Sequence, residues 1–463
     1  MIEAKRLGSQ HFCTTYGLRY PYVAGSMYKG IGSKALVVRM GRAGLLGFFG
    51  TGGLRLPVIA EAIDYIQRHL SSIPGSISPG AYGMNLLCHL EQPDIELSQI
   101  ELFLAKGVHY VEAAAFMQMT PALVLYRLKG LRRTSGDGII VPNRIMGKVS
   151  RPEVAKHFMS PAPEAMVREL LASGNVSQEE AELSQYIPMS HDICVEADSG
   201  GHTDQGVAYA LMPAMLRLRD ELQARYRYGE PMHIGAAGGI GTPEAVAAAF
   251  TLGADFIVTG SINQCSVEAD TSEAAKEMLQ GINVQDTAYA PAGDMFEIGA
   301  RVQVLRKGVF FPARANKLYD LYKHFDSIES IDETTQKQLQ EKYFKRSFAD
   351  VWEETRAYYQ KNQPEALAKA ERHPKSKMAL IFRWYFIYSG RLTRDGVGTR
   401  VDYQIHTGPA LGAFNQWVKG TAIEDWRHRH VDDMAERLMV GAAQLLNERV
   451  AAWTAVDAVA KAA

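Results

Sequence analysis

Two glycine-rich segments near the middle of the chain could bind a phosphate group. The first reads GGIG (residues 238–241) and the second reads TGS (residues 259–261). Glycines let the backbone come close to a ligand, and the exposed N–H groups at the start of a helix bind anions. Thr242 and Pro243 mark such a start, as N-cap and first helical residue. We expect the two segments to hold one phosphate together; the alternative is that their small residues only allow tight packing of a helix on a strand.

A third segment, DSGGH (residues 198–202), places a histidine directly after two glycines. Because the pKa of imidazole lies near neutrality, His202 could act as a general acid or donate a hydrogen bond to a carbonyl group. The alternative is a structural histidine bonded to the backbone. His11, His191 and His233 lack this glycine context, and we expect them to be structural.

The elements that must position these residues follow a regular alternation of apolar runs and helical patterns. Eight runs are predicted strands: Tyr22–Met27, Leu45–Gly50, Ala81–Leu87, Tyr110–Ala115, Arg144–Val149, Ile193–Asp198, His233–Gly238 and Phe256–Ser261. Several are continuously apolar, as strands buried on both faces are. Eight strands with crossover connectors predict an α/β fold, the (β/α)8 TIM barrel, whose loops after strands seven and eight commonly bind phosphate. An open doubly wound sheet is the alternative, but its G-x-G-x-x-G signature is not met, because Glu244 occupies the third glycine position.

The domain organisation predicted from these patterns is a barrel over residues 1–282 followed by a mostly helical C-terminal extension, 283–463, packed on the barrel. The connector after the fifth strand, about residues 150–192, contains helical pieces at Glu164–Ala172 and Gln178–Gln185. A long βα connection often forms a wall or lid of the active site, so we expect a lid-like insertion. In the extension, five residues at helical spacing are expected to be core: Phe344, Phe348, Trp352, Thr355 and Tyr359.

Composition restricts the class of partner and the compartment. The 463 residues carry a net charge of −1, so we expect neither a nucleic-acid nor a membrane partner. The four cysteines form no CxxC pair, so neither a disulfide framework nor a metal site is expected. No signal-peptide or membrane-spanning run is apparent, and we expect a cytoplasmic protein.

Longer motifs resemble a known family. AAGGIGTPEAVAAAFTLGADFIVTGS, VEADSGGHTD and PYVAGSM resemble the flavin barrels of the nitronate monooxygenase and FMN-dependent enoyl reductase superfamily. Asn283–Tyr322, VWEETRAYY and DYQIHTGPALGAFNQWVKGT resemble the PfaD family, the trans-acting enoyl reductases of polyunsaturated fatty acid synthases and trans-acyltransferase polyketide synthases. The match covers nearly the whole chain, and simple nitronate monooxygenases lack the C-terminal part.

The resemblance implies FMN as cofactor, NADPH as reductant and a 2-enoyl thioester on an acyl carrier protein as substrate. It implies His202 as the catalytic residue, with Asp198 or Glu196 orienting it or bonding the ribityl chain. The cofactor-binding residues that it implies lie at the ends of the predicted strands: Gly25, Ser26, Met27, Asn85, Lys148, Asp198, Gly201, Gly238, Gly239, Gly260 and Ser261. Of these, the last four would hold the FMN phosphate.

Two other functions remain open at this stage: a nitronate monooxygenase-type flavin oxidase, and a non-catalytic partner of a multienzyme synthase. Helical appendages often mediate dimers, so a homodimer is one option. Basic residues after the barrel form either a docking face for an acidic carrier protein or ordinary solvated surface: Arg301, Arg306, Lys307, Arg314 and Lys317. The residues do not distinguish a polyketide from a fatty acid synthase partner, nor do they define the acyl chain or the stereochemistry of reduction.

Overall fold

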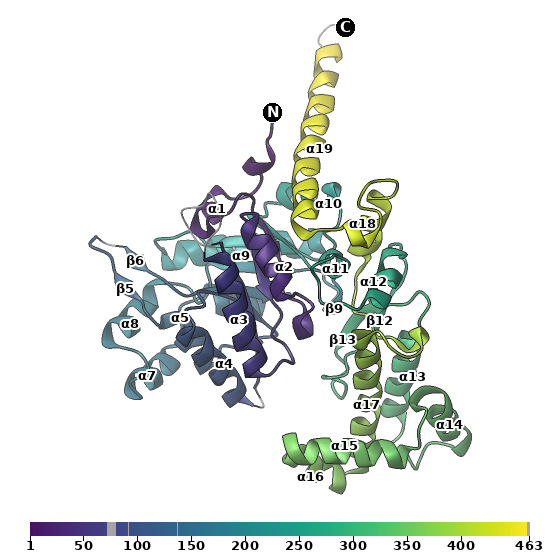
Figure 1. The fold of residues 1–463 in the computed structure, drawn as a ribbon. Coiled ribbons are helices and arrows are strands. Elements are labelled where there is room, and N and C mark those ends of the chain that lie inside the picture. The colour runs from purple at the N-terminus through teal and green to yellow at the C-terminus, as the bar shows by residue number, and fades with distance from the viewer. Residues whose placement is uncertain (72–79, 91, 137, 461–463) are drawn as a thin grey trace. The chain divides into compact units, whose positions relative to one another are not determined.

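Eight parallel strands form a closed barrel in the computed structural model, which describes residues 1–71, 80–90, 92–136 and 138–460 (Figure 1). Around the barrel the order is β1-β11-β10-β8-β7-β4-β3-β2. The strands are β1 (Tyr22–Ala24), β2 (Leu46–Phe49), β3 (Gly83–Leu87), β4 (Tyr110–Ala114), β7 (Arg144–Val149), β8 (Asp192–Glu196), β10 (His233–Ala237) and β11 (Phe256–Thr259). Each coincides with one of the eight predicted strands, so the TIM barrel is confirmed and the open sheet is excluded.

The chain divides into two compact units. The barrel unit comprises residues 1–198, 204–270 and 413–463, and the second unit comprises residues 199–203 and 271–412. This division differs from the boundary expected at residue 282. The last helix, α19 (Val431–Ala460), packs against α10 (Pro243–Thr251) within the barrel unit (Figure 1), which is why the C-terminal residues return to it.

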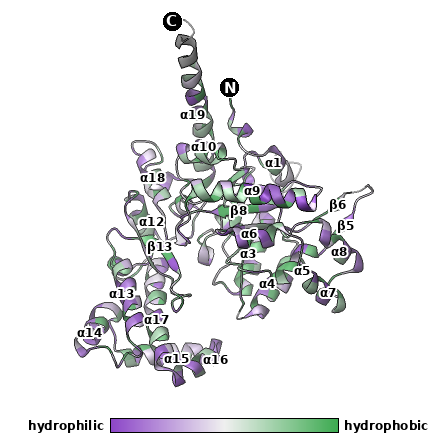
Figure 2. Cartoon of the chain, turned by 180° about the vertical axis from the view of Figure 1, so that it is seen from behind, coloured by the Kyte–Doolittle hydropathy of each residue, from purple (hydrophilic) through white to green (hydrophobic). Residues whose placement is uncertain are grey.

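Helices surround the strands of the barrel unit. They include α2 (Lys34–Arg42), α3 (Leu56–Leu70), α4 (Pro93–Ala105), α5 (Pro121–Leu128), α6 (Pro152–Met159) and α9 (Ala208–Tyr226). Figure 2 shows the contrast between the hydrophobic middle of β8 and the hydrophilic carboxyl-terminal half of α9. Side chains on both faces of β2, β10 and β11 are buried, inside the barrel and beneath the helices.

The insertion after the fifth barrel strand does not form the expected lid. α6 contacts β7, β8 and α9 and is the crossover helix of this connection. α7 (Glu164–Ala172) and α8 (Gln178–Leu183) follow it and contact α5 and the hairpin strand β5 (Arg132–Arg133). Glu180 Oε1 accepts the Gly130 N–H at 2.6 Å. Because the chain between α5 and β7 lies at the amino ends of the strands, the inserted helices cover the face opposite the glycine turns.

The three histidines expected to be structural lie at this same end of the barrel. His233 Nδ1 lies 2.7 Å from the Asp192 carboxylate, and His11 Nδ1 lies 3.1 Å from His233 Nε2. His191 Nδ1 lies 2.8 Å from the buried Arg127 guanidinium. These contacts are of the kind that a structural histidine makes.

The second unit is built on a three-stranded sheet of order β12-β13-β9, which the sequence analysis did not predict. β9 (Gly201–His202) pairs with β13 (Arg301–Leu305), which pairs with β12 (Thr287–Pro291), both antiparallel. The helices of this unit include α12 (Glu273–Gln280), α13 (Phe311–His324), α14 (Glu333–Gln338), the π-helix η4 (Leu339–Phe344), α15 (Phe348–Asn362), α16 (Pro364–Arg372) and α17 (Pro374–Asp395).

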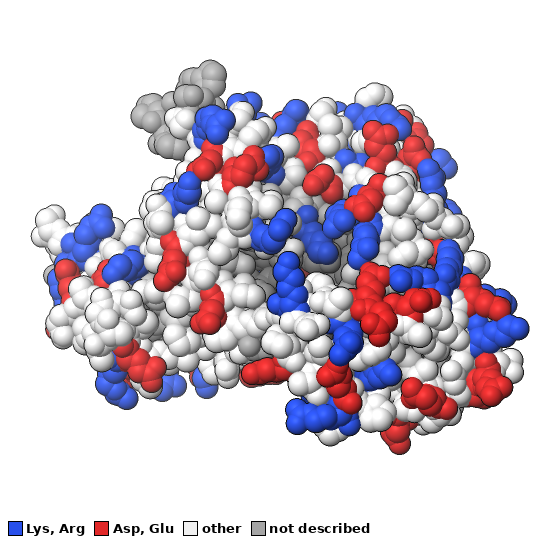
Figure 3. Space-filling view, turned by 60° about the horizontal axis from the view of Figure 1, so that its bottom comes forward, with Lys and Arg blue, Asp and Glu red and all other residues white. Residues whose placement is uncertain are grey.

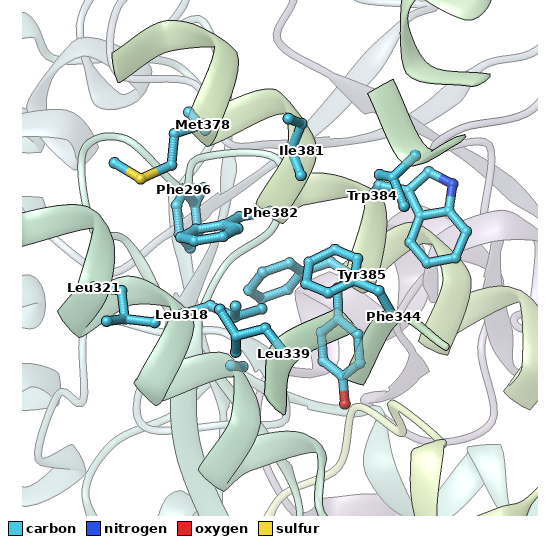
Figure 4. Packing of buried hydrophobic residues seen from close by; sticks show 14 of the residues in the cluster. Phe296, Leu318, Leu321, Leu339, Phe344, Met378, Ile381, Phe382, Trp384 and Tyr385 are labelled. Atoms are coloured by element: carbon cyan, nitrogen blue, oxygen red, sulfur yellow. The ribbon is translucent and has the colours of Figure 1, made fainter. Parts of the chain in front are cut away.

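Aromatic side chains form the core of the second unit (Figure 4). Phe296, Phe344, Phe382 and Tyr385 are almost fully buried and contact one another or shared neighbours. The predicted stripe from Phe344 to Tyr359 contributes to this core and to a small neighbouring cluster, as expected. Within the described residues, no helix has the length and apolar character needed to cross a bilayer.

Candidate active site

Two glycine turns adjoin at the carboxyl ends of neighbouring strands. β10 and β11 pair in parallel with Ala237 opposite Val258, so the turns that follow them start side by side. Gly238 and Gly239 adopt φ of +86° and +74°, in the left-handed region that favours glycine. A Cβ added at Gly239 or Gly260 would meet no described heavy atom within 4 Å, so both turns border open space. This arrangement fits a phosphate held by backbone N–H groups.

Helix α10 begins as the sequence predicts. Thr242 is its N-cap and accepts the Ala245 N–H at 3.4 Å, and Pro243 is the first helical residue. After the neighbouring strand β11, the short helix α11 (Ser261–Gln264) begins directly after Gly260. Both turns therefore lead from a strand into helical backbone.

The turn after β1 lies beside the end of β11. The Gly25 N–H donates to the Thr259 carbonyl at 3.0 Å, which ties the turn to β11. A Cβ on Gly25 would lie 2.8 Å from Val258 Cγ1, so a side chain at this position would collide with the neighbouring strand. The two residues that follow, Ser26 and Met27, are partly exposed.

A buried carboxylate organises the interior at this end. Glu112 on β4 is fully buried, and its Oε2 accepts hydrogen bonds from the Ser26 N–H at 3.2 Å, from Ser26 Oγ and from Asn85 Nδ2 at 3.3 Å. Burial raises the pKa of Glu112, with the Lys148 ammonium opposing the shift. Among the described residues, Glu112 Oε1 has no hydrogen-bond partner. This oxygen can accept a further hydrogen bond from a ligand.

Lys148 supplies the positive charge of the cluster. Its Nζ lies 3.2 Å from Glu196 Oε1. Burial acts to lower the pKa of Lys148, but the carboxylates of Glu196 and Glu112 outweigh it and raise the pKa. The side chain is therefore an ammonium at neutral pH. The polar cluster, defined here as Ser26, Asn85, Glu112, Lys148 and Glu196, offers both donors and acceptors, which suits the polar edge of a heterocyclic cofactor.

Glu112 is one residue of this site that was not predicted from the sequence. It was included in the strand Tyr110–Ala115 but was not considered as a functional residue. The available signal was one carboxylate in an otherwise apolar run, since a buried acid needs a specific partner. Glu196 was expected to orient His202 or to bond the ribityl chain, and the structure pairs it with Lys148.

His202 and Gly201 belong to the second unit, where they form β9. The carboxylate that contacts His202 within this unit is Asp294, whose Oδ1 lies 3.0 Å from His202 Nε2. Partial burial acts to raise the pKa of Asp294, but the His202 imidazole outweighs it and lowers the pKa. His202 is half exposed, so its ring is accessible. Asp198 ends the preceding segment of the barrel unit, and its predicted role remains a prediction.

A second histidine, His406, lies beside β9. It forms an isolated bridge with Val304, and its Nδ1 lies 3.5 Å from the position that a Cβ on Gly201 would take. Burial lowers the pKa of His406 to about 4, and the neighbouring His202 acts in the same direction. His406 is therefore neutral at neutral pH, with its Nε2 lying 2.8 Å from the Gln404 amide nitrogen.

The basic residues after the barrel do not form a uniform surface. Arg314 contacts the buried Asp402 carboxylate and lies over the Tyr343 ring, so its role is structural. Lys307 is exposed and donates to the Gly281 carbonyl at 2.7 Å. Figure 3 shows both signs of charge interspersed over one face of the molecule, in keeping with the net charge of −1. Within the described ranges, no three His, Cys, Asp or Glu side chains form a candidate metal site.

The fold and the turns define a class: a (β/α)8 barrel with glycine turns after strands seven and eight and an added helical unit. A family model described as "[Acyl-carrier-protein] S-malonyltransferase, inserted helical domain" matches residues 325–403. The polyketide biosynthesis protein PksE of Bacillus subtilis is 56% identical over 97% of this chain and 58% of PksE. One of the polyunsaturated fatty acid synthase subunits of Thraustochytrium is 43% identical over 90% of this chain and 28% of that larger protein. The chain therefore spans 58% of the length of PksE and 28% of the length of the Thraustochytrium subunit.

A solved structure matches over its whole length. The enoyl reductase domain of MlnA, from the macrolactin biosynthesis cluster of Bacillus amyloliquefaciens, is 44% identical, with a TM-score of 0.92, over 97% of this chain and 99% of that domain. The chain belongs to the enoyl reductase family of polyketide and polyunsaturated fatty acid synthases, the PfaD family that its motifs resemble.

Proposed function

We propose that this chain is an FMN-dependent, NADPH-linked, trans-acting enoyl reductase. Its substrate would be a 2-enoyl thioester on an acyl carrier protein, and its reaction the reduction of the α,β double bond in polyketide or polyunsaturated fatty acid biosynthesis. The observation that carries the proposal is the pair of adjoining glycine turns after β10 and β11, beside a buried polar cluster, in a member of this family.

The residues present fit FMN. Backbone N–H groups of Gly238, Gly239, Gly260 and Ser261 would bind its phosphate, because both turns border open space and lead into helical backbone. The residues that would contact its ring system are Gly25, Ser26, Met27, Asn85, Glu112 and Lys148. When bound, FMN supplies the hydride-transfer chemistry that no protein side chain provides.

The polar cluster would orient the ring and balance its charge. Lys148 is held as an ammonium by two carboxylates, so it can stabilise negative charge on a bound ligand. Glu112 fixes the Ser26 N–H and the Asn85 amide, and its second oxygen can accept one hydrogen bond. Such preorganised groups spend little free energy on reorientation during the reaction.

His202 would supply the proton. Reduction of a conjugated double bond adds a proton at the α-carbon, and negative charge accumulates on the thioester oxygen. A half-exposed imidazole paired with a carboxylate can protonate the carbon or donate a hydrogen bond to that oxygen. The sequence supports this role, because only residues 197–201 separate His202 from the end of β8.

The test is an absorption spectrum of the purified protein followed by anaerobic titration with NADPH. The proposal predicts a flavin spectrum, bleaching by NADPH and recovery of colour on addition of a crotonyl-carrier thioester. Bleaching by a nitronate with no response to NADPH would instead indicate oxygenation. A colourless protein that cannot be reconstituted with FMN would indicate a non-catalytic partner.

A further inference from the structure

His202 is fixed by the sheet of the second unit. It lies opposite Val302 in the antiparallel pairing of β9 with β13, and the Thr203 N–H donates to the Arg301 carbonyl at 3.2 Å. The backbone of His202 is thus held on both sides of the residue. Its side chain is half exposed and contacts Asp294.

Asp294 lies in an anchored turn between β12 and β13. The Ala292 N–H donates to the Ala300 carbonyl at 2.8 Å, which closes the turn. Phe296, two residues after Asp294, is fully buried and packs against the rings of Tyr322 and Phe386. The aromatic core therefore holds the turn, and with it the carboxylate, in place.

An ionised carboxylate accepts hydrogen bonds and cannot donate them. Because Asp294 Oδ1 lies 3.0 Å from His202 Nε2, the proton of this contact belongs to Nε2. Neutral His202 is then protonated on Nε2, and the imidazolium carries its second proton on Nδ1.

We propose that Asp294 is a positioning residue that holds one proton on His202 Nε2, so that Nδ1 is the atom that transfers a proton to the substrate. The inference rests on the proposed function. In the step, the Nδ1–H bond breaks and its electrons remain on the imidazole. The electron pair of the enolate, formed by hydride addition at the β-carbon, makes the new C–H bond at the α-carbon. Solvent then reprotonates Nδ1.

Among the contacts described within this unit, two further ionisable groups lie near His202. Arg301 on β13 is a cation whose Nη1 donates to Asn316 Oδ1 at 3.1 Å. His406, beside Gly201, is neutral near neutral pH because burial lowers its pKa to about 4.

The test compares Asp294→Asn with Glu297→Gln in the full-length, FMN-loaded protein. Glu297 lies in the same turn, and its substitution by Gln removes the same charge. Its carboxylate pairs with Arg383 and not with His202. We expect Asp294→Asn to lower kcat at least about tenfold and to move the alkaline limb of the kcat/KM profile about one unit toward acid. Glu297→Gln should change neither. Restored activity in Asp294→Glu would support the carboxylate as the active group.

Nitrogen NMR of histidine-labelled protein gives a readout that does not depend on turnover. The wild-type His202 signal should report a proton on Nε2, and Asp294→Asn should shift it toward a mixture of tautomers. An Nδ1-protonated wild-type ring, or an unchanged tautomer and pH profile in Asp294→Asn, would overturn the inference. If the wild-type protein instead lacked enoyl reduction while its Nε2 tautomer depended on Asp294, the proposed function would fail and the positioning contact would stand.

Discussion

Glu112 Oε2 accepts the backbone N–H of Ser26 at 3.2 Å, and this contact joins the middle of β4 to the turn after β1. A fully buried carboxylate thus fixes the backbone that the proposal assigns to the ring of FMN. The same carboxylate raises the pKa of Lys148, although burial opposes this shift.

Replacing Glu112 by Gln should weaken FMN binding. The amide oxygen can still accept from Ser26, but the NH2 group replaces the Oε1 acceptor that the proposal offers to the cofactor, and the negative charge near Lys148 is lost. We expect the Kd for FMN, measured by quenching of flavin fluorescence, to rise about tenfold, which corresponds to about 1.4 kcal/mol. Glu61→Gln, at an exposed pair with Lys34, is the matched control and should leave the Kd unchanged. An unaltered Kd in Glu112→Gln would remove Glu112 from the binding site.

Replacing Gly260 by Val should abolish phosphate recognition without unfolding the protein. The position has no described atom within 4 Å of an added Cβ, and its φ of −132° is negative, but its ψ of −73° places it outside the main allowed regions. We expect a folded protein with a small loss of thermal stability, a Kd for FMN raised at least about tenfold, and an affinity for riboflavin, which lacks the phosphate, that changes little.

Gly238→Ala is the contrasting variant. Its φ is +86°, and a Cβ would lie 2.7 Å from the Ala197 carbonyl oxygen, so we expect a loss of stability of about 1–3 kcal/mol. Equal weakening of FMN and riboflavin by Gly260→Val would contradict the assignment of this turn to phosphate.

Acid should destabilise the fold through Asp192. Burial acts to raise the pKa of this carboxyl, but the hydrogen bond from His233 and the other partners, including Tyr16, outweigh it and lower the pKa. A carboxyl with a lowered pKa stabilises the fold above its unfolded value of about 3.9 and loses this contribution as pH falls through the folded value.

Asp192→Asn should therefore lower the free energy of unfolding by about 3 kcal/mol at neutral pH and by less in acid. Urea titrations between neutral pH and about pH 3 measure this difference. A difference that stays constant over the whole range would show that the charge of Asp192 is not responsible.

The exposed basic residues after β13 could bind the acyl carrier protein. Reversal of Arg306 and Lys307 to Glu should raise KM for a carrier-bound enoyl substrate and leave KM for a short thioester analogue unchanged, because carrier proteins are typically acidic. Steady-state kinetics with both substrates checks this. Equal effects on the two substrates would remove the docking hypothesis.

The barrel could be predicted from sequence because eight mainly apolar runs are separated by connectors long enough for crossover helices. The lid was wrong because residues 152–159 form the crossover helix α6, which shifts the remaining helices to the opposite end. The sheet of the second unit was missed because β9 pairs with β13 about a hundred residues later, and two-residue strands carry no periodic signal. The contact of Asp294 with His202 forms only when β9 pairs with β13, so no local sequence pattern indicates it.

The most direct test of the account is the product of one turnover. FMN-loaded protein, reduced with NADPH under anaerobic conditions, is mixed with crotonyl-carrier thioester, and the carrier is analysed by intact mass. The account predicts a mass gain of two hydrogen atoms with simultaneous return of the flavin colour, and loss of that gain in Gly260→Val, which should not retain FMN. An unchanged carrier mass, with flavin colour returning only on admission of oxygen, would contradict it.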